Sequence, residues 1–167
     1  FIDLKKRVKT EDIFYVEADY IWGRRYKLFQ WRSKIKDYSV TLGAGIHMID
    51  LIMWIMNKKP LYVTSYSNSL VTNKTKFKKK SFLIYIFEFS KNVIVKITAN
   101  AGGIYNHFHE IKIFEKNKTL VNNFLGSYMF KKKGIKTQFK KIYSKYPDRK
   151  NRKKIIKNFL EILIDKR

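Results

Sequence analysis

The spacing of apolar residues predicts where strands and helices lie. Apolar and polar residues alternate from Ile13 to Ile21 and from Phe108 to Glu115, as expected for half-buried strands. Ile46 to Met56 forms a longer apolar run that stops before Asn57-Lys58-Lys59-Pro60, which predicts a helix. Further strands are predicted over Leu61–Leu70, Phe82–Phe89, Val93–Thr98 and Thr119–Phe124, and a closing helix over Ile155–Ile164.

One major helix, a run of strands and a closing helix indicate the α+β class, with an open, mostly antiparallel sheet and helices packed on one face. The turn Ser90-Lys91-Asn92 predicts a hairpin, and the lysine-rich residues 131–154 a solvated connection. The 167 residues suffice for one domain with its own core. The chain starts without Met, and Phe1–Val8 is typical of the end of an amphipathic helix. We therefore expect residues 1–167 to be a fragment of a longer protein.

The formal net charge of +24 could indicate a protein that binds nucleic acid. Thirty of the 37 basic residues are Lys, although Arg is the better bidentate ligand for phosphate and guanine. Lys, Ile, Asn, Phe and Tyr share AT-rich codons, so a low-GC genome would produce this charge without selection for polyanions. We favour that interpretation over nucleic-acid binding. The alternative is a basic module that binds single strands through the Lys- and Tyr-bearing residues 131–154.

Other features of the composition exclude several classes of site. The chain has no cysteine, which excludes disulfides and thiolate metal sites, and its three histidines lack metal-ligand spacing, so no metal site is expected. No signal peptide is visible, and no apolar run is long enough to span a bilayer. We expect a cytoplasmic protein with no membrane contact.

The segment from Leu42 to Met56, LGAGIHMIDLIMWIM, carries the most informative chemistry. Gly43 and Gly45 would let the backbone approach a neighbour closely and turn sharply into the helix. His47 would then lie in the first helical turn, where the positive end of the macrodipole disfavours an imidazolium. A neutral imidazole can exchange a proton with a substrate hydroxyl, whereas a helix-terminal histidine can equally be a packing or capping residue. Asp50, one turn on, shares its face.

The motifs around this segment come in a characteristic order. Tyr20-Ile21-Trp22-Gly23-Arg24-Arg25 precedes Trp31-Arg32-Ser33, then Tyr38-Ser39, then Gly-x-His-x-x-Asp at residues 45–50, Trp54 and Pro60. This order resembles the C-terminal domain of the glucose–fructose oxidoreductase / inositol dehydrogenase / rhizopine-catabolism (Gfo/Idh/MocA) family. The likeness extends from the first predicted strand to about Leu120.

The resemblance implies an NAD(P)-dependent oxidoreductase that acts on a sugar, nucleotide sugar or cyclitol. Its N-terminal Rossmann domain, which would bind NAD or NADP and supply a catalytic lysine, is missing from these residues. Residues 1–167 would form the substrate-binding domain and, through the open sheet, the surface of a homo-oligomer. His47 matches the family's catalytic histidine, and Trp31 and Arg32 match a pair that lies beside the cofactor in many relatives. The fragment alone is expected to be inactive.

Two further candidates bind substrate in this interpretation. Tyr38 can hydrogen-bond a sugar hydroxyl or be a core or rim residue, and Asp50 can contact substrate or pin loop backbone. The chain also departs from the family pattern, because many relatives carry Asp where this chain has Gly43. A glycine cannot orient the imidazole or share its proton, so a pseudoenzyme scaffold remains a third hypothesis.

Overall fold

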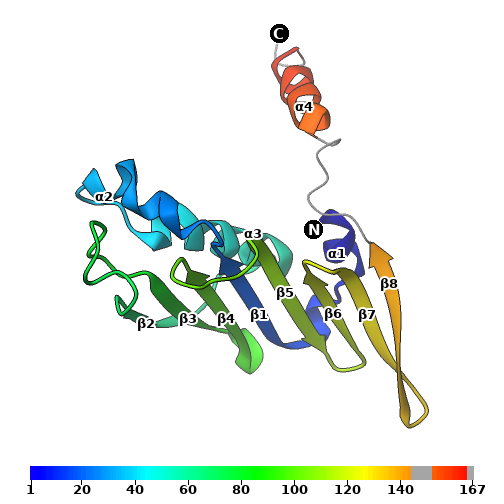
Figure 1. Ribbon diagram of the computed structural model, residues 1–167. Coiled ribbons are helices and arrows are strands. Elements are labelled where there is room, and N and C mark those ends of the chain that lie inside the picture. Colours follow the sequence, from blue (N-terminus) through cyan, green and yellow to red (C-terminus); the bar gives the residue numbers. More distant parts are fainter. Residues whose placement is uncertain (144–151, 165–167) are drawn as a thin grey trace.

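The strands pair into one sheet, in the order β2-β3-β4-β1-β5-β6-β7-β8, in the computed structural model of the chain (Figure 1). The structure describes residues 1–143 and 152–164. The strands are β1 (Ile13–Ile21), β2 (Tyr62–Asn68), β3 (Phe82–Phe89), β4 (Val93–Asn100), β5 (Phe108–Glu115), β6 (Lys118–Asn123), β7 (Gly126–Lys133) and β8 (Lys136–Tyr143). The parallel pairing of β1 with β4 is the exception, since the other paired strands are antiparallel. The predicted open, mostly antiparallel sheet is confirmed.

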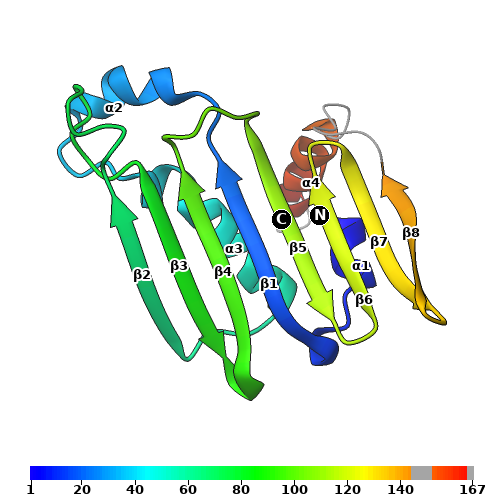
Figure 2. The same ribbon diagram turned by 60° about the horizontal axis from the view of Figure 1, so that its bottom comes forward.

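The helices α1, α2 and α3 lie on one face of this sheet (Figures 1 and 2). The α-helices are α1 (Ile2–Arg7), α2 (Trp31–Lys34), α3 (Ile46–Met56) and α4 (Arg152–Ile164). Shorter helical turns are η1 (Thr10–Asp12), η2 (Arg25–Phe29), η3 (Thr41–Gly45) and η4 (Ser90–Asn92). The predicted α3 helix ends as expected, because Asn57 adopts the left-handed conformation that closes a helix and Pro60 follows. No helix among residues 1–143 and 152–164 is long and apolar enough to cross a bilayer.

The core lies between α3 and the central strands. Met48, Ile52 and Ile55 of α3 are at most 1% exposed, and they recur at the spacing of one helical face. The sheet side of this core consists of alternating buried residues of the central strands, Val16 and Ala18 of β1, Val95 and Ile97 of β4, and Ile111 and Ile113 of β5. The period-2 pattern in the sequence therefore did specify which face of each central strand is buried.

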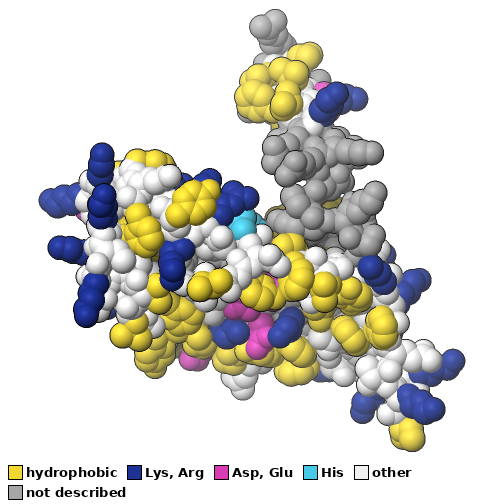
Figure 3. Space-filling model, viewed as in Figure 1, with side chains coloured by type: hydrophobic (Ala, Val, Ile, Leu, Met, Phe, Trp, Pro, Cys, Tyr) yellow, Lys and Arg dark blue, Asp and Glu magenta, His cyan; other side chains and the backbone are white. Residues whose placement is uncertain are grey.

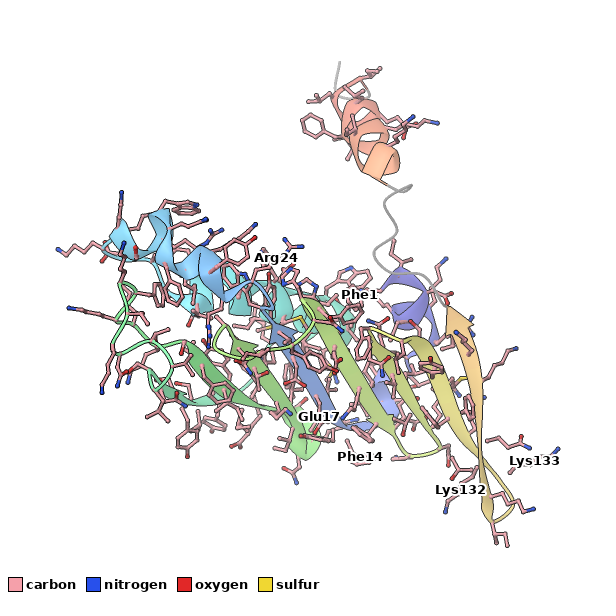
Figure 4. The ribbon with its side chains drawn as sticks, viewed as in Figure 1. Phe1, Phe14, Glu17, Arg24, Lys132 and Lys133 are labelled. Carbon is pink, nitrogen blue, oxygen red and sulfur yellow. The ribbon has the colours of Figure 1, made fainter. Side chains whose placement is uncertain are left out.

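The opposite face of the sheet carries a network of charges between apolar flanks. Glu17 lies 2.9 Å from Lys112 and 3.7 Å from Lys96, and Lys96 lies 3.6 Å from Asp19. Figure 4 shows Glu17 pointing away from the helices, and Figure 3 shows acidic and basic side chains at the centre of this face with apolar surface beside them. Burial alone would raise the pKa of Glu17, but the hydrogen bond and charge of Lys112 and the charge of Lys96 lower it on balance. These acids and bases are therefore paired within one chain.

Two predictions about local structure were wrong. Part of the segment 131–154, predicted to be a solvated connection, is β-structure: its first residues end β7, and β8 pairs with β7 to form the edge hairpin. Both sides of the hairpin near its tip are exposed to solvent and carry lysines, so the sequence shows no period-2 pattern there.

The position of the two glycines relative to the helix was also predicted wrongly. Helical backbone already begins at Val40 and runs through the π-turn η3, so Gly43 and Gly45 lie inside the helix and His47 is beyond its first turn.

Candidate active site

Helix α3 presents a second face, beside its core face, to a cavity of about 620 Å³. This face consists of His47, Asp50, Leu51 and Trp54, whose spacing of three, four and seven residues places them in one row. His47 and Asp50 are exposed, as residues that meet a ligand must be. Lys5 of α1 fixes the far end of the row, because its ammonium donates to the backbone oxygen of Trp54 (2.6 Å) and lies 4.1 Å from the indole centroid.

The central strands supply the floor of the cavity. Tyr20 of β1 pairs across the sheet with His109 of β5, and both side chains line the cavity with His47. The Tyr20 ring lies edge-on to His109, with centroids 4.4 Å apart, and roughly parallel to His47 at 6.0 Å. His107 meets the same ring at 5.7 Å. The β1–β5 register, the loop before β5 and helix α3 together place all three histidines of the chain around one buried tyrosine.

Burial and nearby positive charge lower the pKa values of His107 and His109. Burial, with smaller contributions from the neighbouring His107 and His47, lowers the pKa of His109 to about 4. Burial is also the main reason why the pKa of His107 is lowered, with Arg24 adding to the effect. At neutral pH these two rings can donate and accept hydrogen bonds but carry no charge.

Arg32 lies in a second cluster, made almost entirely of aromatic rings. The guanidinium carbon lies 4.2 Å from the ring centroid of Trp31, 5.1 Å from that of Trp22 and 5.8 Å from that of Tyr38. Its Nε donates a hydrogen bond to the Tyr38 hydroxyl at 3.2 Å. Burial raises the pKa of Tyr38, and Arg32 partly opposes that shift. Trp31 is 53% exposed, so the cluster offers a flat ring and a cation to the outside.

Gly43 allows Tyr38 to reach this position. A Cβ on residue 43 would lie 2.0 Å from the Tyr38 hydroxyl oxygen and 2.6 Å from the ring carbon that bears it. The phenol therefore occupies the space into which any larger side chain at position 43 would extend. At Gly45, by contrast, an added Cβ would lie 3.4 Å from Ala99 and 3.5 Å from Tyr85, which is ordinary van der Waals contact. The predicted close approach of backbone is confirmed at Gly43 but not at Gly45, and the predicted sharp turn is wrong.

The residues predicted from sequence thus fall into two neighbouring groups. His47 and Asp50 line the cavity, whereas Trp31, Arg32 and Tyr38 form the aromatic cluster, and Tyr38 is not among the described residues that line the cavity. Trp22 connects the groups, because it touches Arg32 and lies 6.2 Å from Tyr20.

Sequence reasoning did not propose Tyr20, Trp54 or His109 for the site. Trp54 could have been found, since it follows His47 by seven residues and so shares its helical face. Tyr20 and His109 enter through strand register, for which the sequence carries no signal. No group of three or more His, Asp or Glu within the described residues is placed to hold a metal ion.

Comparison with known proteins decides the family. Residues 5–154 match the Gfo/Idh/MocA family in the part described as "Oxidoreductase family, C-terminal alpha/beta domain". The chain belongs to this family. The match extends well beyond Leu120, the limit expected from sequence, because β7 and part of the chain after it are included. Among proteins with curated functions, none matches the chain.

Several solved structures share the fold of this family member. UDP-N-acetylglucosamine 3-dehydrogenase from Acidithiobacillus ferrooxidans superposes with a TM-score of 0.73 at 17% identity, over 99% of this chain and 50% of its own. Levoglucosan dehydrogenase, in a complex with NADH and levoglucosan, gives 0.68 at 12% identity over 84% of this chain and 43% of its own. Myo-inositol 2-dehydrogenase from Lactobacillus plantarum gives 0.60 at 14% identity over 72% and 35%. The chain therefore spans half or less of the length of each of these proteins.

Proposed function

We propose that the chain is the substrate-binding domain of an NAD(P)-dependent oxidoreductase that oxidises or reduces a hydroxyl-bearing carbon of a sugar, nucleotide sugar or cyclitol. The observation that carries the proposal is the cavity in which His47 and Asp50 of α3 face Tyr20 and His109 of the sheet. An exposed imidazole beside a carboxylate and two further hydrogen-bonding rings suits a ligand with several hydroxyl groups. The names of the three structural relatives, which specify UDP-N-acetylglucosamine, levoglucosan and myo-inositol, support this substrate class.

In this proposal His47 handles the proton of the reacting hydroxyl. During oxidation the carbon loses a hydride and its hydroxyl loses a proton, and the imidazole accepts that proton. In the reverse direction the imidazolium returns it. Asp50 lies on the same helical face and accepts hydrogen bonds from neighbouring hydroxyl groups, which fixes the orientation of the substrate.

The aromatic cluster fits a dinucleotide. Trp31 presents an exposed ring for stacking, and Arg32 keeps a charge next to it for a phosphate or a polar ring substituent. A bound NAD or NADP would supply the hydride acceptor or donor. Residues 1–167 contain no Gly-x-Gly-x-x-Gly loop, so we expect a separate Rossmann domain to bind most of the cofactor, and the chain alone to be inactive. One relative was solved with NADH, which supports a nicotinamide cofactor.

The open face of the sheet is the proposed surface for homo-oligomerisation. Its apolar flanks include Tyr62 and Tyr66 of β2, which are 69% and 65% exposed, and Phe14 of β1, which is 56% exposed. The internally paired Glu17, Lys96 and Lys112 lie between the flanks. A second copy of the same face could bury these rings against each other.

Replacement of His47 by Asn tests the proposed chemistry, in a protein that includes the Rossmann domain. Asn keeps a polar side chain but cannot exchange a proton, so we expect kcat to fall by roughly 10²–10⁴-fold. The exposed side chain makes few core contacts, so the melting temperature should change little. Near-normal turnover by this variant would remove His47 from the mechanism and favour a binding or scaffold role.

A further inference from the structure

Lys79, in the loop between β2 and β3, makes contacts that its lysine-rich neighbourhood does not suggest. Its ammonium donates to three backbone oxygens, those of Ile35 (2.6 Å), Lys36 (2.6 Å) and Tyr38 (3.1 Å). An ammonium has three N–H donors, so each one has an acceptor. By contrast, Lys78 and Lys80 are exposed to solvent. Lys79 therefore holds the turn that leads from α2 to Tyr38.

The loop that carries Lys79 is itself firmly anchored. The hydroxyl of Thr72, which is 0% exposed, donates to the backbone oxygen of Lys79 at 2.5 Å. Phe77, which is 1% exposed, places its ring edge-on to Tyr38 with centroids 6.1 Å apart. Two side chains of this loop thus restrain Tyr38: Lys79 contacts its backbone, and Phe77 contacts its ring.

Tyr38 in turn restrains Arg32. The Tyr38 hydroxyl accepts the hydrogen bond from Arg32 Nε, and its ring forms one side of the aromatic surroundings of the guanidinium. An arginine side chain has several rotatable bonds, so a contact that fixes the head group also fixes which N–H groups remain available to a ligand. The contacts therefore run without interruption from the loop, through Lys79 and Tyr38, to Arg32.

We propose that Lys79 is a positioning residue of the dinucleotide-facing cluster: by clamping the 35–38 turn it holds Tyr38, and through Tyr38 it sets the orientation of the Arg32 guanidinium. The lysine-rich loop between β2 and β3 then serves as a support for the cofactor side of the site. The expected effect of Lys79 on cofactor affinity rests on the proposed function of Arg32. Its expected effect on the orientation of the Arg32 side chain does not.

The test compares Lys79→Met with the matched control Lys80→Met in the protein with its Rossmann domain. Both changes remove one charge from the same loop and shorten the side chain by a single atom. We expect Lys79→Met to weaken NAD(H) or NADP(H) binding, measured by fluorescence titration, about tenfold, and to leave kcat at saturating cofactor largely unchanged. Lys80→Met should stay within about twofold of the wild type, and Lys79→Arg, which keeps a donating cation, should lie between the two variants.

Two readouts separate positioning from a general loss of structure. In an Arg32→Ala background, Lys79→Met should cause no further loss of affinity, because the residue it positions is gone. The ¹⁵N-detected Nε–H signal of Arg32, sharpened by its hydrogen bond to Tyr38, should broaden or vanish in Lys79→Met and persist in Lys80→Met.

The outcomes distinguish this proposal from the proposed function. An unchanged Arg32 signal in Lys79→Met, or an equal loss of affinity with and without Arg32, would overturn the role of Lys79. If Lys79→Met abolishes the signal but Arg32→Ala binds cofactor normally, the clamp is correct and the cofactor role of Arg32 is wrong.

Discussion

Replacement of Gly43 by Ala should destabilise this protein, although the same change usually stabilises a helix. Gly43 has helical neighbours and lies inside the continuous helix that starts at Val40. In an ordinary helix interior, Gly to Ala stabilises by about 0.5–1 kcal/mol, because glycine loses more backbone freedom on folding. Here the new methyl group would lie 2.0 Å from the Tyr38 hydroxyl oxygen, so the phenol must move.

The cost of that movement follows from what holds the ring. Moving the phenol breaks the hydrogen bond from Arg32 and disturbs the edge contacts with Trp31 and Phe77. A hydrogen bond to a charged group contributes about 1.5–3 kcal/mol, less where it is partly exposed as here, and an aromatic pair about 0.5–1.5 kcal/mol. A total loss of about 2–3 kcal/mol exceeds the helical gain, so we expect Gly43→Ala to lower the free energy of unfolding by about 1–2 kcal/mol.

Urea denaturation of four proteins tests this reasoning: wild type, Gly43→Ala, Tyr38→Ala and the double variant. Once Tyr38 is removed the methyl group has space, so Gly43→Ala should then stabilise by about 0.5–1 kcal/mol. The sign of the effect therefore reverses between the two backgrounds. Stabilisation by Gly43→Ala in the presence of Tyr38 would refute the close contact and, with it, the reason for glycine at this position.

Two further predictions concern His109 and the open sheet face. The pKa of His109 is lowered to about 4 in the folded protein from its ordinary value of 6.5, so the unfolded chain takes up the proton first as pH falls. The contribution of His109 to the free energy of unfolding is therefore complete above about pH 6.5. That free energy should decline toward pH 4 by about 1–2 kcal/mol, after allowance for partial exposure. Urea unfolding at pH 7 and pH 4.5 should show a smaller decline for His109→Gln, and an equal decline would contradict the assignment. Replacing Tyr62 and Tyr66 together by Lys should shift the oligomer toward monomer, as measured by light scattering. The control Ile104→Lys, at a 92% exposed loop position, should leave the mass unchanged. An unchanged mass for the tyrosine variant would place the interface elsewhere.

The sequence predicted most of the fold because burial leaves a periodic trace. Strands β1 and β5 alternate apolar and polar residues, and the structure buries the predicted face of each. The end of helix α3 at Met56 was predicted correctly, since an apolar run of helical length meets a Pro-containing stop, but its helical backbone begins earlier than predicted, at Val40. The β7–β8 hairpin was missed because lysines occupy both of its faces, and an edge strand rich in lysine keeps little of the alternation that burial enforces.

For the candidate site, sequence alone determined the residue types and their local spacing: a Gly-x-His-x-x-Asp segment on a helix, a Trp-Arg pair before it, and no metal-ligand pattern. Only the tertiary structure decided which of these residues meet. The pairing of Tyr20 with His109 depends on the register between β1 and β5, which are more than 80 residues apart in the chain, and a shift of one residue would put the two side chains on opposite faces. The assignment of Tyr38 to Arg32 rather than to the His47 cavity depends on the space that Gly43 leaves free and on the clamp of Lys79, contacts that no periodicity in the sequence encodes.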